Sequence, residues 1–195
     1  MWNDLRHGLR SLCLCALGLI LVLPVAAQER SFELDSSVTT VTMTLGDVLH
    51  TVHGTFKAKG GTIRFDSSSG TASGSFTVDA TTGDTGNSTR DRKMHKEILE
   101  SSKFPEISFS PTKITGSVAN GSSVQVEGIF RIHGTDHPMT LMVPITLNGD
   151  ALTAKFHFVV PYVAWGMKNP STFVLRVGKE VDIDVTAVGY LAQAH

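Results

Sequence analysis

Apolar residues alternate with other residues along most of the chain, in short runs that end at Gly, Asn, Asp or Ser. The clearest run has an apolar residue at every second position from Met139 to Leu147, and the alternation resumes from Leu152 to Val160 after an Asn148-Gly149 step. A period of two places alternate side chains on opposite faces of a β-strand. Because Asn-Gly favours a tight hairpin turn, these runs predict two antiparallel strands, each with one apolar face.

Further segments show the same alternation, and each predicts another strand with one apolar face. Such strands bury that face and protect their edges by closing into a barrel or by pairing as a sandwich. The sequence therefore predicts an all-β fold of antiparallel strands. The alternating residues are Val41, Met43 and Leu45; Ile63 and Phe65; Phe76 and Val78; Phe130 and Ile132; and Val181, Ile183 and Val185.

One segment, from Arg90 to Phe104, lacks the alternation of a strand. It places apolar residues such as Met94 and Ile98 on one face of a helix instead. The polar residues 87–89 are suited to cap the start of this helix, and Pro105 is suited to end it. We expect one short helix inserted between strands.

The first 27 residues have the three-part layout of a secretory signal peptide. Basic residues precede an uncharged run from Leu12 to Val22, and small residues follow it. The run is shorter than the roughly 20 residues of a membrane-spanning helix, so we expect cleavage after Ala27 and no stable membrane anchor. The mature chain, residues 28–195, is then expected to be one exported domain, either periplasmic or secreted.

Both cysteines, Cys13 and Cys15, lie in the segment that we expect to be removed, which leaves no thiol for a disulfide or a metal. Removing Arg6, Arg10 and Asp4 from the 17 basic and 18 acidic residues of the chain leaves 15 and 17. A net charge of about −2 provides no basic patch for nucleic acid. We therefore expect neither a nucleic-acid partner nor a cofactor.

Histidines suggest one alternative, a metal-dependent enzyme that draws its ligands from His50, His53, His133, His137 and His157. Residues three apart on a strand point to opposite faces, which separates the first two. A turn between His133 and His137, centred on residues 134–136, would bring those two imidazoles closer together. Metal sites constrain ligand number and geometry strictly, and no Gly-x-Ser-x-Gly motif is present. We predict no catalytic residue and no metal ligand.

The inward apolar residues are open to two interpretations. A small barrel is either filled by its own side chains or leaves room for one ligand, and alternation alone does not decide between them. A filled barrel would be a structural or interaction module, whereas a hollow one would enclose an apolar ligand. Our candidates for the lining of a cavity are Phe56, Phe65, Phe76, Val143, Ile145, Phe156 and Phe158.

The segment RDRKMHKEILESSKFPEISFSPTKI, residues 90–114, resembles the signature region of the YceI-like polyisoprenoid-binding family. In that family an Arg-Asp or Arg-Asn pair and a following His open a short helix, and Arg90, Asp91 and His95 stand at the matching positions. Phe104-Pro105 then leads into a strand, as in the family. Residues 50–66, 72–87 and 132–147 also resemble the family, whereas the match weakens over residues 159–173.

This resemblance implies a lipocalin-like, eight-stranded antiparallel barrel with one short inserted helix. It also implies an exported carrier, with a long isoprenoid or a similar fatty-acyl amphiphile in its interior, and a homodimer as a possible assembly. Arg90 and His95 would either contact the ligand's head group or fix the helix by hydrogen bonds. Trp165 would serve either as a lid or as a packed aromatic residue.

Overall fold

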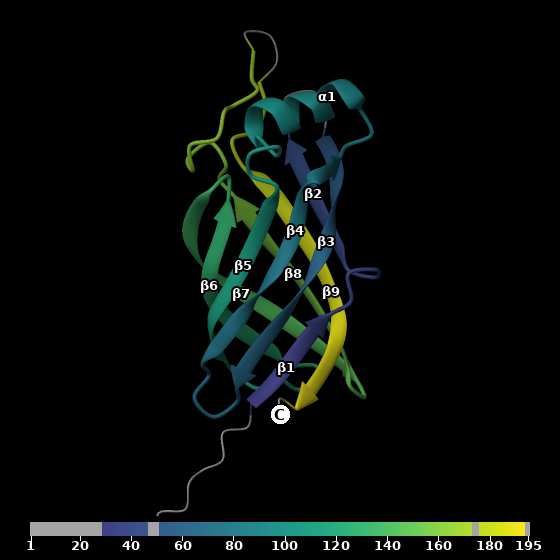
Figure 1. The fold of residues 1–195 in the computed structure, drawn as a ribbon, viewed down its shortest axis with the longest axis vertical. Helices are drawn as coiled ribbons and strands as arrows, with labels where there is room; N and C mark the ends of the chain where they lie inside the picture. Colours follow the sequence, from purple (N-terminus) through teal and green to yellow (C-terminus); the bar gives the residue numbers. More distant parts are fainter. Residues whose placement is uncertain (1–28, 47–50, 173–175, 194–195) are drawn as a thin grey trace, which may run out of the picture.

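The computed structural model describes residues 29–46, 51–172 and 176–193, and the predicted signal peptide lies outside these ranges. Within them, strands wind around a common axis and one helical segment lies at one end (Figure 1). The strands are β1 (Glu29–Leu34), β2 (Thr40–Gly46), β3 (Thr51–Asp66), β4 (Ala72–Asp84), β5 (Glu106–Thr115), β6 (Ser123–Ile132), β7 (Thr135–Asn148), β8 (Ala151–Val160) and β9 (Val181–Gln193).

These strands form one closed antiparallel barrel. Hydrogen-bonded neighbours follow the order β1-β3-β2-β9-β8-β7-β6-β5-β4, and the pairing of β3 with β4 closes the ring. β1 pairs with residues 62–66 of β3, whereas β2 pairs with residues 51–56 of the same strand, and both also pair with β9. β1 and β2 thus share one position in the wall. The nine segments make eight barrel positions, which confirms the predicted eight-stranded barrel.

Residues 35–39 leave the wall between β1 and β2 and are tied back to β9. The Asp35 N–H donates to the Val188 carbonyl at 2.8 Å, and the Val188 N–H donates to Thr39 Oγ1 at 3.1 Å. The Thr39 side chain is buried. Its hydroxyl therefore serves as the local partner that a continuous strand would have provided.

The ladder between β7 and β8 is short. Partner pairs cover only residues 145–148 of β7 and 151–154 of β8, although both strands continue beyond them. The Ile145 N–H donates to the Ser122 carbonyl on the β6 side, so the nitrogen of the preceding Pro144 faces β8. Because proline has no N–H to donate, the ladder ends there.

Alternate residues of each strand point into the barrel, as the sequence predicted. On β7, Leu141, Val143 and Ile145 are buried, whereas the intervening Met142 and Pro144 are exposed. The hairpin between β7 and β8 turns at residues 149–150, with φ of +61° at Gly149, so the predicted Asn-Gly hairpin is confirmed. The hydrophobic core is therefore the inner surface of the barrel itself.

The inserted helix consists of α1 (Ser88–Lys93) and a continuing π-helical turn, η1 (Met94–Ile98). The Asn87 side chain caps it by accepting hydrogen bonds from the Thr89 and Arg90 N–H groups. The helix ends at Ile98, before the predicted limit at Pro105, because Glu100 adopts a positive φ of 45° that no right-handed helix can continue through. In the described ranges, no helix is long and apolar enough to cross a membrane.

A two-residue turn, His133-Gly134, joins β6 to β7. Both residues have positive φ, 52° and 75°, as a hairpin turn of the type I′ class requires. The turn therefore occupies residues 133–134 and not the expected 134–136, since Ile132 and Thr135 already pair across the hairpin.

A candidate ligand-binding cavity

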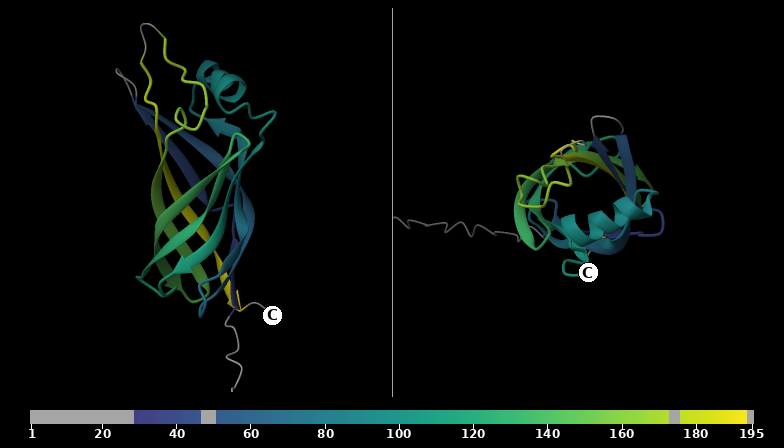
Figure 2. Two further views of the ribbon diagram at one scale, coloured as in Figure 1. Left: turned by 90° about the vertical axis from the view of Figure 1, so that its left-hand side faces the viewer. Right: turned by 90° about the horizontal axis from the view of Figure 1, so that it is seen from above.

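The barrel encloses a cavity of about 650 Å³. This volume is within the range of about 300–1,000 Å³ that ligand pockets occupy. The cavity reaches from Val118, in the connection between β5 and β6, to Arg90 on α1 at the other end. We call the α1 end, where residues 161–172 also lie, the mouth (Figure 2). The barrel contains this cavity, so the filled-barrel alternative is not favoured.

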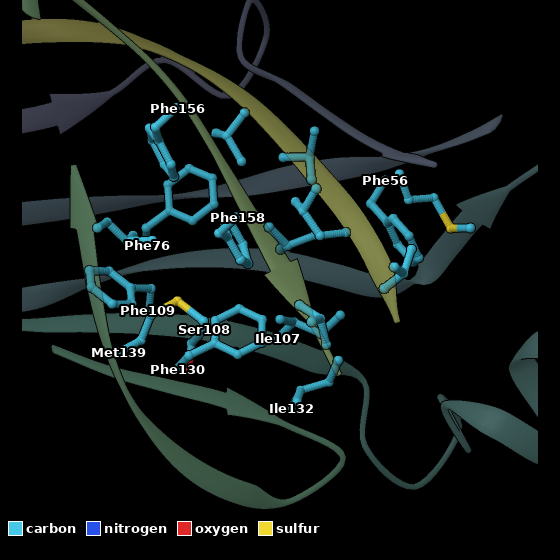
Figure 3. Close-up of a pocket in the computed structure, with 18 of the residues that line it drawn as sticks. Phe56, Phe76, Ile107, Ser108, Phe109, Phe130, Ile132, Met139, Phe156 and Phe158 are labelled. Carbon is cyan, nitrogen blue, oxygen red and sulfur yellow. The ribbon is translucent and has the colours of Figure 1, made fainter. Parts of the chain in front are cut away.

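Phenylalanine rings from several strands project into this cavity (Figure 3). Phe158 on β8 contacts Phe130 on β6 edge to face, with ring centroids 5.6 Å apart, and lies 6.3 Å from Phe156 on its own strand. Strand alternation explains this arrangement because Phe156 and Phe158 share one face of β8. All seven residues that we expected on a cavity wall line it, namely Phe56, Phe65, Phe76, Val143, Ile145, Phe156 and Phe158.

The polar side chains of the wall gather at the mouth. Thr85 follows β4, while Asn87, Thr89, Arg90 and Lys93 belong to α1 or its cap, and all five line the cavity. Deeper in the barrel, the lining side chains of the described chain are apolar except Ser108 on β5. The arrangement suits an elongated amphiphile with an apolar tail inside the barrel and a polar end at α1.

Arg90 is fixed at the mouth by Thr85. Its Nε donates to Thr85 Oγ1 at 2.7 Å and its Nη2 donates to the Thr85 carbonyl at 2.8 Å. Thr85 in turn donates its N–H and its hydroxyl to the Asp91 carboxylate. This network sets the start of α1 against the end of β4, so Arg90 has a structural role and also lines the cavity.

Two neighbours of Arg90 on the same helix also line the mouth, and the sequence did not single them out as ligand contacts. Lys93 Nζ donates to the Pro170 carbonyl at 3.1 Å, which links α1 to the segment after β8. Met94 lines the wall at the first residue of η1. The signal that could have found them is their spacing, since residues three and four positions after Arg90 share its helical face.

His95 lies beside the cavity and holds the helix in place. Its Nδ1 is 3.0 Å from Ser101 Oγ and its Nε2 is 2.8 Å from the Gly83 carbonyl. A carbonyl only accepts, so Nε2 donates to the Gly83 carbonyl, while Nδ1 shares a hydrogen bond with the Ser101 hydroxyl. The imidazole thus joins the helix to the end of β4, and contact of His95 with a ligand stays a prediction.

Trp165 packs over the mouth end of the barrel without lining the cavity. Its ring stacks on His137 of β7 at 3.9 Å between centroids and lies 5.9 Å from Phe130. Trp165 follows β8, so this stack joins β8 to β7 in the region where the two strands share no ladder pairs. The geometry fits the packed-aromatic role, and contact of Trp165 with a ligand stays a prediction.

The candidate metal ligands do not come together. His53 contacts Thr44, His133 contacts Glu100, and His157 lies near Asp182 and Asp184 on the outer surface, while His50 lies outside the described residues. Among the described residues, no three His, Cys, Asp or Glu side chains are placed to share a metal ion. The metal-enzyme alternative is not favoured.

Tyr162 is the buried titratable group of the mouth. Its hydroxyl donates to the Gly178 carbonyl at 2.6 Å, which ties the segment after β8 to the segment before β9. Burial raises the pKa of the Tyr162 hydroxyl, because the phenolate is poorly solvated there.

The fold and this cavity define a closed eight-stranded barrel built around an apolar pocket. A family model for the YceI-like domain matches residues 32–188, and the chain belongs to that family. No curated protein matches the chain.

Three solved structures share the barrel. BcnA of Burkholderia cenocepacia is 20% identical with a TM-score of 0.66, over 80% of this chain and 98% of that one. A polyisoprenoid binding domain from Saccharophagus degradans, implicated in plant cell wall breakdown, is 11% identical with a TM-score of 0.66, over 82% and 97%. The YceI protein of Campylobacter jejuni is 15% identical with a TM-score of 0.56, over 75% and 87%.

Proposed function

We propose that this protein is an exported carrier that encloses the chain of a long isoprenoid or a similar fatty-acyl amphiphile. The observation that carries the proposal is the apolar cavity of about 650 Å³, which has polar side chains only at its mouth apart from Ser108. The YceI-like family of the chain and the similarity of its barrel to a polyisoprenoid binding domain support the same function.

The dimensions of the barrel suit a chain that lies lengthwise. A ten-residue strand such as β8 spans roughly 33 Å, and the strand tilt of about 40° in barrels shortens this to a height of about 25 Å. Burial of about ten methylene groups would contribute about 8 kcal/mol before the costs of association and ordering. A longer hydrocarbon chain buries more methylene groups, so apolar contact can supply much of the binding free energy without any catalytic group.

The residues of the cavity wall also support binding over catalysis. Among the described lining residues there is no Asp, Glu, His or Cys to act as a general base, a nucleophile or a metal ligand. The two cations at the mouth, Arg90 and Lys93, are suited to hold a ligand, and the hydroxyl of Tyr162, which also lines the cavity, donates to the Gly178 carbonyl. We propose that the protein is not an enzyme.

Mass spectrometry of organic extracts tests the carrier function. Residues 28–195 would be purified without denaturation from the host compartment, and extracted lipids would be quantified against protein. We expect a stoichiometric isoprenoid or acyl species. A clean extract, together with no binding of isoprenoids or fatty acids added afterwards, would exclude the carrier function.

Export is a separate proposal based on the residues before Gln28. Intact-mass analysis of the protein from fractionated cells should show a chain that begins at Gln28 in the periplasmic or secreted fraction. A full-length chain in the cytosol would contradict it. Light scattering of the same sample tests the proposed homodimer.

A further inference from the structure

Arg90 and Lys93 are the charged side chains on the described part of the cavity wall. Both lie on α1 at the mouth, and no described carboxylate forms an ion pair with either of them. Lys168 at the same end is paired with Glu97 at 2.7 Å, so its charge is already balanced. The mouth therefore presents positive charge next to an apolar interior.

The hydrogen bonds of the two cations leave donors available. Arg90 uses Nε and Nη2 on Thr85, and its guanidinium carries further N–H groups. The ammonium of Lys93 makes one hydrogen bond, to the Pro170 carbonyl, out of the three that it can donate. These contacts go to a hydroxyl and to carbonyls, while the carboxylates of the same helical segment, Asp91 and Glu97, bond to Thr85 and to Lys168 and form no direct ion pair with Arg90 or Lys93.

Local composition strengthens the positive character of the mouth. The helical segment 88–98 carries Arg90, Arg92, Lys93 and Lys96 against Asp91 and Glu97, while the whole chain has a net charge of −1. A ligand that seals the mouth removes water from Arg90 and Lys93. Covering a cation with a neutral group is costly, whereas an anionic group compensates for the lost water.

We propose that the ligand has an anionic polar end, a phosphate or a carboxylate, which Arg90 and Lys93 bind at the mouth. This inference rests on the proposed carrier function and adds the charge class of the head group. An isoprenyl phosphate and a fatty acid share this chemistry, and direct comparison separates them.

Matched pairs of probes test the charge class. Farnesyl phosphate with farnesol, and palmitate with hexadecanol, would be titrated by calorimetry into delipidated residues 28–195 at pH 7 and low salt. We expect each anion to bind about tenfold or more tightly than its alcohol, since charge-assisted hydrogen bonds are worth that much, and added salt to reduce this preference. A stronger preference for farnesyl phosphate over its alcohol would assign a phosphate head group. A stronger preference for palmitate over its alcohol would assign a carboxylate.

Three variants test whether Arg90 and Lys93 cause the preference for anions. Lys93→Met and Arg90→Gln should each lower the ratio of anion affinity to alcohol affinity within a matched pair. Lys96→Met is the control, because Lys96 is exposed on η1 and does not line the cavity. Because the readout is a ratio within a pair, a variant that weakens binding of the anion and of the alcohol equally does not support the inference.

The outcomes separate the two proposals. Equal affinity of anions and alcohols, or equal effects of Lys93→Met and Lys96→Met, would overturn the anionic head group and leave the carrier function standing. Failure of all four probes to bind would overturn the carrier function, and the head-group inference with it.

Discussion

Glu100 and His133 contact each other on one side of the mouth, beside the neighbouring strands β5 and β6, with Oε2 and Nε2 2.7 Å apart. They are also the non-glycine residues with positive φ in the described part of the chain, at 45° and 52°. The His133 ring packs against Phe104, with ring centroids 4.6 Å apart. The contact therefore joins the end of the helical segment to the turn between β6 and β7 through two backbone positions that cost energy to hold.

Glu100→Ala should lower the free energy of unfolding by about 1 kcal/mol, because it removes the hydrogen bond and keeps a side chain at a positive φ. Glu100→Gly should cost less, since glycine adopts that φ freely. Chemical denaturation measures both. Glu180→Ala, at an exposed position outside any described ion pair, is the control, and equal losses in the alanine and glycine variants would contradict the strain explanation.

Ala154→Phe should reduce ligand affinity by about tenfold or more, because Ala154 lines the cavity and the ring displaces the equivalent of at least about two methylene groups of ligand. Lys155→Phe introduces the same ring at the next position, on the outer face of β8. Titration with palmitate compares the two variants. Similar affinity in both would place the ligand outside the barrel.

Tyr162→Phe should change how stability depends on alkaline pH. Burial raises the pKa of Tyr162 in the folded chain above its ordinary value of 10.0. The stabilisation that the protonated hydroxyl gives to the folded chain is therefore complete below pH 10 and is lost as pH rises through the folded pKa. The variant should lose about 1 kcal/mol at neutral pH, from the Gly178 hydrogen bond, and should depend less on pH above 10. Urea titrations from pH 7 to about 11 test this against Tyr190→Phe, because Tyr190 as a residue is 60% exposed.

Gly189→Ala should destabilise the barrel by about 1–3 kcal/mol through overpacking. A Cβ at Gly189 would lie 2.1 Å from the Glu33 carbonyl oxygen of β1. Gly46→Ala is the matched control, because its Cβ would meet nothing within 4 Å and neither glycine has a positive φ. Thermal unfolding distinguishes them, and equal melting temperatures would contradict the predicted close approach of β1 and β9.

Strand faces could be predicted because alternation is a local property of the sequence. The inward residues of β7 and β8 are those that alternation assigned, and the Asn-Gly step marks their hairpin. Whether the interior is hollow could not be predicted, since the period gives the direction of a side chain and not the distance across the barrel. The break between β1 and β2 could not be predicted either, because it depends on a hydrogen bond between Thr39 and Val188, which are far apart in the sequence.

The mouth could be predicted in part. The family resemblance pointed to Arg90, which lines the cavity, and to His95, which lies behind the wall on Gly83. The resemblance gave both residues the same two possible roles, and the contacts of His95 with Ser101 and Gly83 are what separate them. Glu100 limits the helix through a positive φ that no residue preference of glutamate indicates.

The short ladder between β7 and β8 has a consequence for solubility. An unpaired strand edge can form hydrogen bonds with a strand from another molecule. The exposed Met142 and Val159 on these two strands would favour such association. Pro138 lies six positions before Pro144, so its nitrogen faces the same side. Two prolines thus deprive this edge of donors at the places where a foreign strand would bond. The residues that loosen the barrel wall also protect the protein from aggregation.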